Sequence, residues 1–300
     1  MNINVIGVPL FFGCDRKGVD LAPNKLREKG LVKIIENNGN KVSDLGNILV
    51  KERDEKDKYA YHNNMKYVDS IIEVDKSLAE KVYSSLNDKA FPLIIGGDHA
   101  LGLGSICGAS KYFKEDLAVI WIDAHGDINT DENSPSGNVH GMPLAAAMGF
   151  GNECLTDLYF KGRKVKPENV FLIGARDLDH GELELIEKEH LNVYSTKEVK
   201  ERGIKAILED VNKKLNEKAI NNVHLSFDID CIDPSFAPGT GTPVVDGLTV
   251  EEAKTSLTYL LNTNKIKSMD FVELNTELEN GDKTIELCLD LIDLISKNIK

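Results

Sequence analysis

Three apolar segments of this 300-residue chain end in acidic and imidazole side chains. Apolar runs of this length, bounded by glycine or polar residues, are typical of strands that are buried on both faces. In open α/β sheets, ligands collect just outside the carboxyl ends of such strands. The side chains that the three runs bring to their ends are His99, then Asp123, His125 and Asp127, then Asp228 and Asp230.

These six side chains have the chemistry of a metal centre. Imidazole nitrogen and carboxylate oxygen without thiolate suit a divalent ion of the Mn, Fe, Co and Ni group, with zinc also open. Six groups exceed what one tetrahedral ion needs and suit two ions about 3.5–4 Å apart. Four aspartates would also balance two divalent cations. The alternative is that each acid is a turn residue and each histidine is satisfied within the fold.

Alternating strand-like and helix-like segments position these residues, which predicts a parallel sheet with helices on both faces. Two helices have Ser/Thr-x-x-Glu start signals, at Ser195 and Thr249. No linker or internal repeat divides the chain, so we expect one domain over 1–300. The expected strands are 3–8, 41–44, 91–95, 118–123, 170–174, 192–194, 222–228 and 268–274, and the expected helices are 22–37, 62–86, 101–113, 182–189, 205–218, 250–262 and 283–297.

Two long irregular stretches, 129–142 and 236–247, directly follow two of these strands. Long segments without regular structure in a compact domain are usually functional or disordered. Their position after strands that end in metal-type residues favours a function. We therefore expect both stretches to lie at the site.

Composition excludes several classes of protein. Hydrophobic residues make up 41% and charged residues 28% of the chain, as in globular proteins. A net charge of −13 argues against a nucleic-acid partner and weakly favours a cationic small molecule. Five scattered cysteines without a CxxC pair argue against a disulfide framework. The N-terminus reads as a strand and no apolar run reaches membrane-spanning length, so we expect no membrane partner and a cytoplasmic location.

Three motifs resemble the metal signatures of the ureohydrolase family, which comprises arginases, agmatinases and relatives. They are GGDH at 96–99, DAHGD at 123–127 and SFDID at 226–230, and the similarity runs from about residue 5 to 275. The resemblance implies a three-layer α/β/α fold around an eight-stranded parallel sheet and two Mn(II) ions per subunit, with Co, Ni or Fe as substitutes. It implies that His99, Asp123, Asp127 and Asp228 hold one ion and that Asp123, His125, Asp228 and Asp230 hold the other.

Further matches indicate the substrate. Residues 134–143 are similar to the loop with which arginases bind the amino-acid end of arginine, although such a stretch taken alone is only a loop. Acidic residues at the start of a helix, such as Asp179 and Glu182, can instead stabilise the helix by interacting with its dipole. The resemblance implies that Ser134, Ser136 and Asn138 bind the α-carboxylate, and that Asp179 and Glu182 meet the α-ammonium directly or through water. It also implies that Glu273 binds the guanidinium, that Thr242 walls the pocket and that Asn129 is a further substrate contact.

The resemblance also implies a reaction. A hydroxide that bridges the two ions attacks the guanidinium carbon of L-arginine, Asp127 passes a proton to the leaving amine, His140 assists, and urea and L-ornithine leave. A hydrolase for agmatine or another guanidino compound is the nearest alternative. A non-catalytic arginine-binding regulatory protein on the same fold is the alternative from another class. The family suggests a homo-oligomer, either a trimer or a hexamer.

Overall fold

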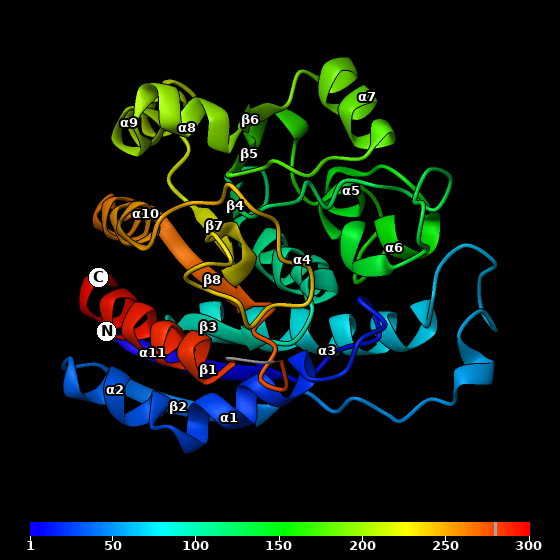
Figure 1. Cartoon of the computed structure of the whole chain (residues 1–300), viewed down its shortest axis with the longest axis horizontal. Helices are drawn as coiled ribbons and strands as arrows, with labels where there is room; N and C mark the ends of the chain where they lie inside the picture. Colours follow the sequence, from blue (N-terminus) through cyan, green and yellow to red (C-terminus); the bar gives the residue numbers. More distant parts are fainter. Residues whose placement is uncertain (279–280) are drawn as a thin grey trace.

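An eight-stranded, entirely parallel sheet forms the centre of the molecule (Figure 1). The structure is a computed structural model that describes residues 1–278 and 281–300. The strand order is β2-β1-β3-β8-β7-β4-β5-β6. The strands are β1 (Asn2–Val8), β2 (Lys41–Asn47), β3 (Phe91–Gly96), β4 (Ala118–Ile122), β5 (Val170–Ile173), β6 (Asn192–Tyr194), β7 (Val223–Asp228) and β8 (Ile266–Val272).

Helices cover both faces of the sheet, which gives the three layers that the sequence predicted (Figure 1). Alternate side chains of a strand point to opposite faces, so β4 sends Ile120 into one core and Trp121 into the other. One layer contains α1 (Ala22–Glu28), α2 (Leu31–Asn37), α8 (Thr196–Arg202), α9 (Ile204–Glu217), α10 (Val250–Asn262) and α11 (Gly281–Asn298). The other contains α3 (Val68–Asn87), α4 (Gly102–Phe113), α5 (Pro143–Met148), α6 (Glu153–Thr156) and α7 (His180–Glu189).

Several predicted helix boundaries are wrong, for reasons of backbone conformation. The single helix expected over 22–37 is two helices, because Gly30 adopts a φ of 98° between them. The helix expected from residue 62 begins only at Val68, since Tyr67 has a φ of 49°. The short helices α5, α6 and α8 were not predicted as helices, although the Ser195 start signal is confirmed: its hydroxyl accepts a hydrogen bond from Glu198 N.

Strand β8 ends two residues earlier than predicted, at Val272, because Glu273 has a φ of 65° and turns the chain out of the sheet. All five cysteines are free thiols. Among the helices of the described residues, none combines the length and apolar composition that crossing a bilayer requires.

Candidate active site

The site lies at the carboxyl ends of the four adjacent strands β3, β8, β7 and β4. His99 begins a 3-10 turn (His99–Leu101) three residues after β3, Asp123 follows β4, Asp228 ends β7 and Glu273 follows β8. All four strands run in the same direction, so their carboxyl ends meet at one edge of the sheet. Residues more than a hundred positions apart in the sequence therefore lie side by side.

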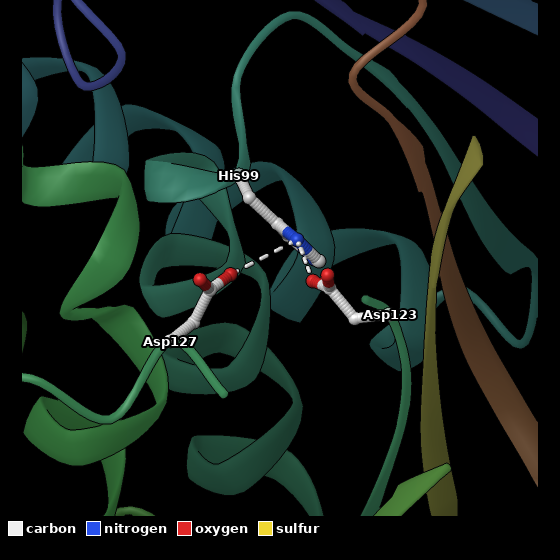
Figure 2. Close-up of side chains that lie close together, drawn as sticks. All are labelled: His99, Asp123 and Asp127. Atoms are coloured by element: carbon white, nitrogen blue, oxygen red, sulfur yellow. Dashed lines mark ion pairs between the residues drawn. The ribbon is translucent and has the colours of Figure 1, made fainter. Parts of the chain in front are cut away.

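The first group of ligand-type atoms surrounds the Nδ1 atom of His99. This nitrogen lies 2.8 Å from Asp123 Oδ2, 3.2 Å from Asp127 Oδ2 and 3.1 Å from Asp228 Oδ2. Figure 2 shows the Asp123 and Asp127 carboxylates converging on the imidazole from two sides. His99 Nδ1 is buried yet makes no well-directed hydrogen bond to any described residue. Such convergence without hydrogen bonding is the arrangement expected of atoms that share a cation.

The second group surrounds His125 and shares a carboxylate with the first. His125 Nδ1 lies 3.3 Å from Asp123 Oδ1 and 3.1 Å from Asp230 Oδ2. Asp123 thus presents one oxygen to each histidine. The candidate ligand atoms of His99, Asp123 and Asp127 lie within 4.8 Å of one another, and so do those of Asp123, His125 and Asp230. A carboxylate that serves two neighbouring groups is suited to bridging two ions.

The electrostatics of the cluster also fit bound cations. Burial and the charge of Asp123 raise the pKa of Asp127 to about 6. Burial, followed by the charges of Asp230 and Asp123, raises the pKa of Asp228 well above its usual range. Buried carboxylates this close repel one another unless positive charge is supplied. Two divalent cations would supply it, so the residues present fit a binuclear metal centre.

A small cleft of about 120 Å³ opens above this cluster. Two of the candidate ligands, His125 and Asp127, line its floor, together with His140, whereas the other ligands lie beneath the surface. Seven of the eight residues that the sequence suggested for substrate binding also line the cleft; these are Asn129, Ser134, Ser136, Asn138, Asp179, Glu182 and Thr242.

Glu273 is the exception, because it lies beneath His140 and is only 2% exposed. Its Oε1 accepts a hydrogen bond from His99 N at 2.9 Å and lies 3.2 Å from His140 Nδ1. Glu273 therefore links the backbone of one candidate metal ligand to a histidine of the cleft.

Comparison with known proteins identifies the family. A sequence model described as the arginase family matches residues 1–295. The chain belongs to this family. It is 40% identical to an arginase of Bacillus subtilis (strain 168), over 99% of this chain and 98% of that protein.

Solved structures of arginases are similar over the same length. The crystal structure of arginase from Bacillus cereus has a TM-score of 0.91 and 40% identity, covering 98% of both chains. That of Entamoeba histolytica arginase in complex with L-ornithine has a TM-score of 0.90 and 33% identity, again covering 98% of both chains. The fold predicted from the sequence is therefore confirmed as that of the arginase family.

At the rim of this arginase-family cleft, two serine hydroxyls donate no hydrogen bond to any residue within 1–278 and 281–300. Ser134 Oγ accepts a hydrogen bond from Gly137 N, and Ser136 Oγ accepts one from Asn138 N, both at 3.1 Å. Because a hydroxyl oxygen that accepts can still donate its own hydrogen, both serines are available to an anionic ligand. The backbone bonds hold the two oxygens in place for that task.

The same loop is fastened to the rest of the molecule through Asn138. Its Oδ1 accepts a hydrogen bond from Lys66 Nζ at 2.8 Å, and its Nδ2 donates one to the carbonyl of Cys14 at 3.2 Å. The second hydrogen of Nδ2 remains for a ligand. Sequence reasoning missed Lys66, which has no motif around it.

Asp179 and Glu182 form a capping box at the start of α7. Glu182 Oε2 accepts a hydrogen bond from Asp179 N at 2.9 Å, and its Oε1 accepts one from Ile128 N at 3.1 Å. Burial raises the pKa of Glu182 to about 7. Asp179 is exposed and accepts a hydrogen bond from Asn129 Nδ2 at 2.8 Å. Glu182 is thus occupied by the backbone, whereas the outer side of Asp179 faces the cleft mouth.

Trp121 and Asp98 support the site and were not singled out from the sequence. The Trp121 ring stacks on that of His99 at a centroid distance of 3.9 Å, and its Nε1 donates to Asp123 Oδ2 at 3.0 Å. Asp98 Oδ2 accepts hydrogen bonds from Gly13 N at 2.7 Å and Cys14 N at 3.1 Å, which fixes the segment that Asn138 contacts. The position of Asp98 within the GGDH motif could have indicated its role. Nothing in the sequence indicated a role for Trp121, apart from its being the only tryptophan in the sequence.

Two residues of the site have an unusual backbone conformation. Asp127 has a φ of 52° and Glu273 a φ of 65°, in the left-handed region that non-glycine residues rarely occupy. Such conformations cost of the order of 1–3 kcal/mol each and persist where the surrounding structure enforces them. In both cases the turn points a carboxylate at the cluster.

Proposed function

We propose that the protein is a metal-dependent hydrolase that converts L-arginine to L-ornithine and urea. The observation that carries the proposal is the pair of ligand groups joined through Asp123 at the base of a cleft whose rim offers free hydroxyls and an exposed carboxylate. The relatives described above, which are named arginases, support the same activity. One of them was solved with L-ornithine, the amino acid that this reaction releases.

The proposed cofactor is two Mn(II) ions per subunit, with Co(II), Ni(II) or Fe(II) as substitutes. In this proposal, His99, Asp123, Asp127 and Asp228 hold one ion, and Asp123, His125, Asp228 and Asp230 hold the other. The bound ions would lower the pKa of a water molecule and offset the negative charge that develops on the substrate. Oxygen-rich ligand sets without thiolate favour manganese over softer metals.

Each end of the substrate has its own set of proposed contacts. Glu273 binds the guanidinium, which remains protonated in proteins and pairs well with a carboxylate. The free hydroxyls of Ser134 and Ser136, with Asn129 and Asn138, bind the α-carboxylate. Asp179 binds the α-ammonium from the cleft mouth. The remaining proposed contacts are Glu182, which supports Asp179, and Thr242, whose hydroxyl donates to Asp230 Oδ2 at 3.1 Å.

Two groups handle protons in this proposal. The leaving amine of L-ornithine must gain a proton, and Asp127 lines the floor of the cleft where the reacting carbon would lie. His140 lies 3.2 Å from Glu273, whose carboxylate outweighs the effect of burial and raises the pKa of His140 above its ordinary value. His140 can therefore hold a proton near the guanidinium. Asp127 therefore acts as the acid and His140 assists.

We also propose that residues 1–300 form one catalytic domain and that the protein works in the cytoplasm as a homo-oligomer. The single sheet and its continuous strand order support the one domain. Five free cysteines suit a reducing compartment. A trimer or hexamer is expected by analogy with the family.

The test is urea release from L-arginine and from agmatine, measured after loading with Mn(II) and again after chelation. Activity on L-arginine that the chelator abolishes is the expected result. Activity on agmatine alone would retain the metal chemistry but refute the roles of Ser136, Asn138 and Asp179. Binding of L-arginine without urea release by the Mn(II)-loaded protein would indicate a regulatory binding protein instead.

A further inference from the structure

A chain of buried polar side chains leads from His99 away from the cleft, into the layer between the sheet and α4. His99 Nε2 lies 2.7 Å from Ser226 Oγ, and Ser226 Oγ lies 3.4 Å from Asp270 Oδ2. The three side chains are at most 1% exposed. Neither Ser226 nor Asp270 lines the cleft, and neither is among the proposed substrate contacts.

The direction of these hydrogen bonds follows from the requirements of a metal ligand. A histidine that binds a cation through Nδ1 carries its proton on Nε2. In His99, Nε2 then donates to Ser226 Oγ, and the Ser226 hydroxyl is left to donate its own hydrogen to Asp270 Oδ2. If Ser226 donated to His99 instead, the imidazole proton would lie on Nδ1 and block the ligand position.

Asp270 is held in place by further buried partners. Its Oδ2 accepts a hydrogen bond from Ser105 Oγ of α4 at 2.6 Å and lies 2.9 Å from His224 Nε2 of β7. His224 Nδ1 in turn lies 2.8 Å from Ser268 Oγ of β8. All of these side chains are fully buried. A buried carboxylate with several donors is a fixed acceptor, so Asp270 presents a constant partner to Ser226.

We propose that Asp270, acting through Ser226, is a positioning residue for the metal ligand His99. By accepting the Ser226 hydrogen, it selects the tautomer and ring orientation in which Nδ1 of His99 faces Asp123, Asp127 and Asp228. Outer partners of this kind typically change metal affinity by about 10–100-fold. The inference rests on the proposed metal centre and is independent of which guanidino compound is hydrolysed.

The competing explanation is that the cluster only ties α4 to the sheet. Ser105 and Ser226 separate the two explanations, because both donate to Asp270 Oδ2 and both are fully buried, but only Ser226 contacts His99. A purely structural cluster would respond alike to the loss of either hydroxyl. If the side chains position His99, metal affinity should fall when the Ser226 hydroxyl is lost but not when the Ser105 hydroxyl is lost.

The experiment compares Ser226→Ala with the matched control Ser105→Ala in the full-length protein. Mn(II) dissociation constants are measured by competition with a chromogenic chelator, and Tm is measured for the metal-free proteins. We expect Ser226→Ala to weaken the binding of one of the two ions by about 10–100-fold, and Ser105→Ala to leave both affinities nearly unchanged. Equal effects of the two substitutions on Mn(II) affinity, or no effect of Ser226→Ala, would overturn the proposal.

Asp270→Asn, made in the parent and in Ser226→Ala, tests whether Asp270 acts through Ser226. In the parent, Asp270→Asn should weaken the binding of the same Mn(II) ion. In Ser226→Ala it should cause no further loss of Mn(II) affinity, whereas an additive loss of affinity would contradict the proposal. Should Asp270→Asn fail to fold, Asp270→Glu, which keeps the carboxylate, replaces it in the same pair of backgrounds. These titrations need no arginine, so a parent that binds two Mn(II) ions without releasing urea refutes the proposed function and leaves this inference intact.

Discussion

Replacing Asp179 by asparagine tests the amino-acid end of the cleft with little disturbance of the fold. Asp179 is the N-cap residue of α7, and asparagine is as good an N-cap as aspartate. Asn129 Nδ2 donates to Asp179 Oδ2 at 2.8 Å, and a carboxamide oxygen can accept the same bond. Asp179→Asn therefore removes one negative charge at the cleft mouth and changes little else.

The size of the effect follows from the exposure of Asp179. A charge about 4 Å from the α-ammonium is worth about 1 kcal/mol in water and about 4 kcal/mol at an effective dielectric constant of 20. Asp179 is exposed, so the lower figure applies. Exposed ion pairs contribute about 0.2–1 kcal/mol, which corresponds to a rise in KM for L-arginine of up to about fivefold. The value of kcat should stay unchanged.

The assay is steady-state urea release by the Mn(II)-loaded parent and variant. The control substrate is the des-amino analogue of L-arginine, whose KM should not respond to Asp179→Asn because it has no α-ammonium. A similar rise in KM for both substrates, or none for L-arginine, would refute the proposed contact. A fall in kcat of more than about tenfold, equivalent to 1.4 kcal/mol, would mean that Asp179 acts on the reacting atoms.

The metal centre, Trp121 and Glu182 give three more expected outcomes. Each of the two Mn(II) ions, when present at a hundred times its Kd, should stabilise the fold by about 2.7 kcal/mol, so identical melting curves before and after chelation would contradict a metal centre. Trp121 stacks on His99, so its fluorescence should change during an Mn(II) titration and level off at saturation; a flat emission would place the ions elsewhere. In the native metal-free protein, the pKa of Glu182 is raised from 4.5 to about 7, so stability should fall by up to about 3 kcal/mol as pH rises between those values. Glu182→Gln should make this decline shallower in urea unfolding measured across that range, with the remainder due to groups such as Asp127, and an unchanged slope would assign the decline to another group.

The sheet could be predicted from the sequence because its strands are apolar on both faces. The run that became β4 has no polar residue between Ala118 and Ile122, and a buried parallel strand is the structure that such a run forms. The break at Gly30 had a signal that the prediction passed over, since glycine readily adopts the left-handed conformation that ends helices. The break at Tyr67 had no such signal, because a tyrosine rarely adopts that conformation. Short helices such as α6 lack the length that a periodic pattern needs.

The sequence indicated which candidate metal ligands would lie close together, but it did not indicate the contacts that position them. The alternation of Asp123, His125 and Asp127 after an apolar run is visible in the sequence, and the structure brings these residues together with His99. The stacking of Trp121 on His99 and the bonds of Ser226 depend on side-chain contacts between distant strands. Neither contact has a local spacing signature. The positive φ of Asp127 was also not predicted, because most aspartates do not adopt this conformation even though aspartate is among the residues that tolerate it best.

The place of β8 in the sheet has a consequence for synthesis on the ribosome. This last strand pairs with β3 on one side and β7 on the other, so it joins the half-sheet β2-β1-β3 to the half-sheet β7-β4-β5-β6. A nascent chain that has emerged only as far as α10 contains His99 and all four aspartates of the centre, but it lacks the strand that pairs with both β3 and β7. We therefore expect the sheet edge on which His99 and Asp228 meet to be completed only after β8 has been synthesised.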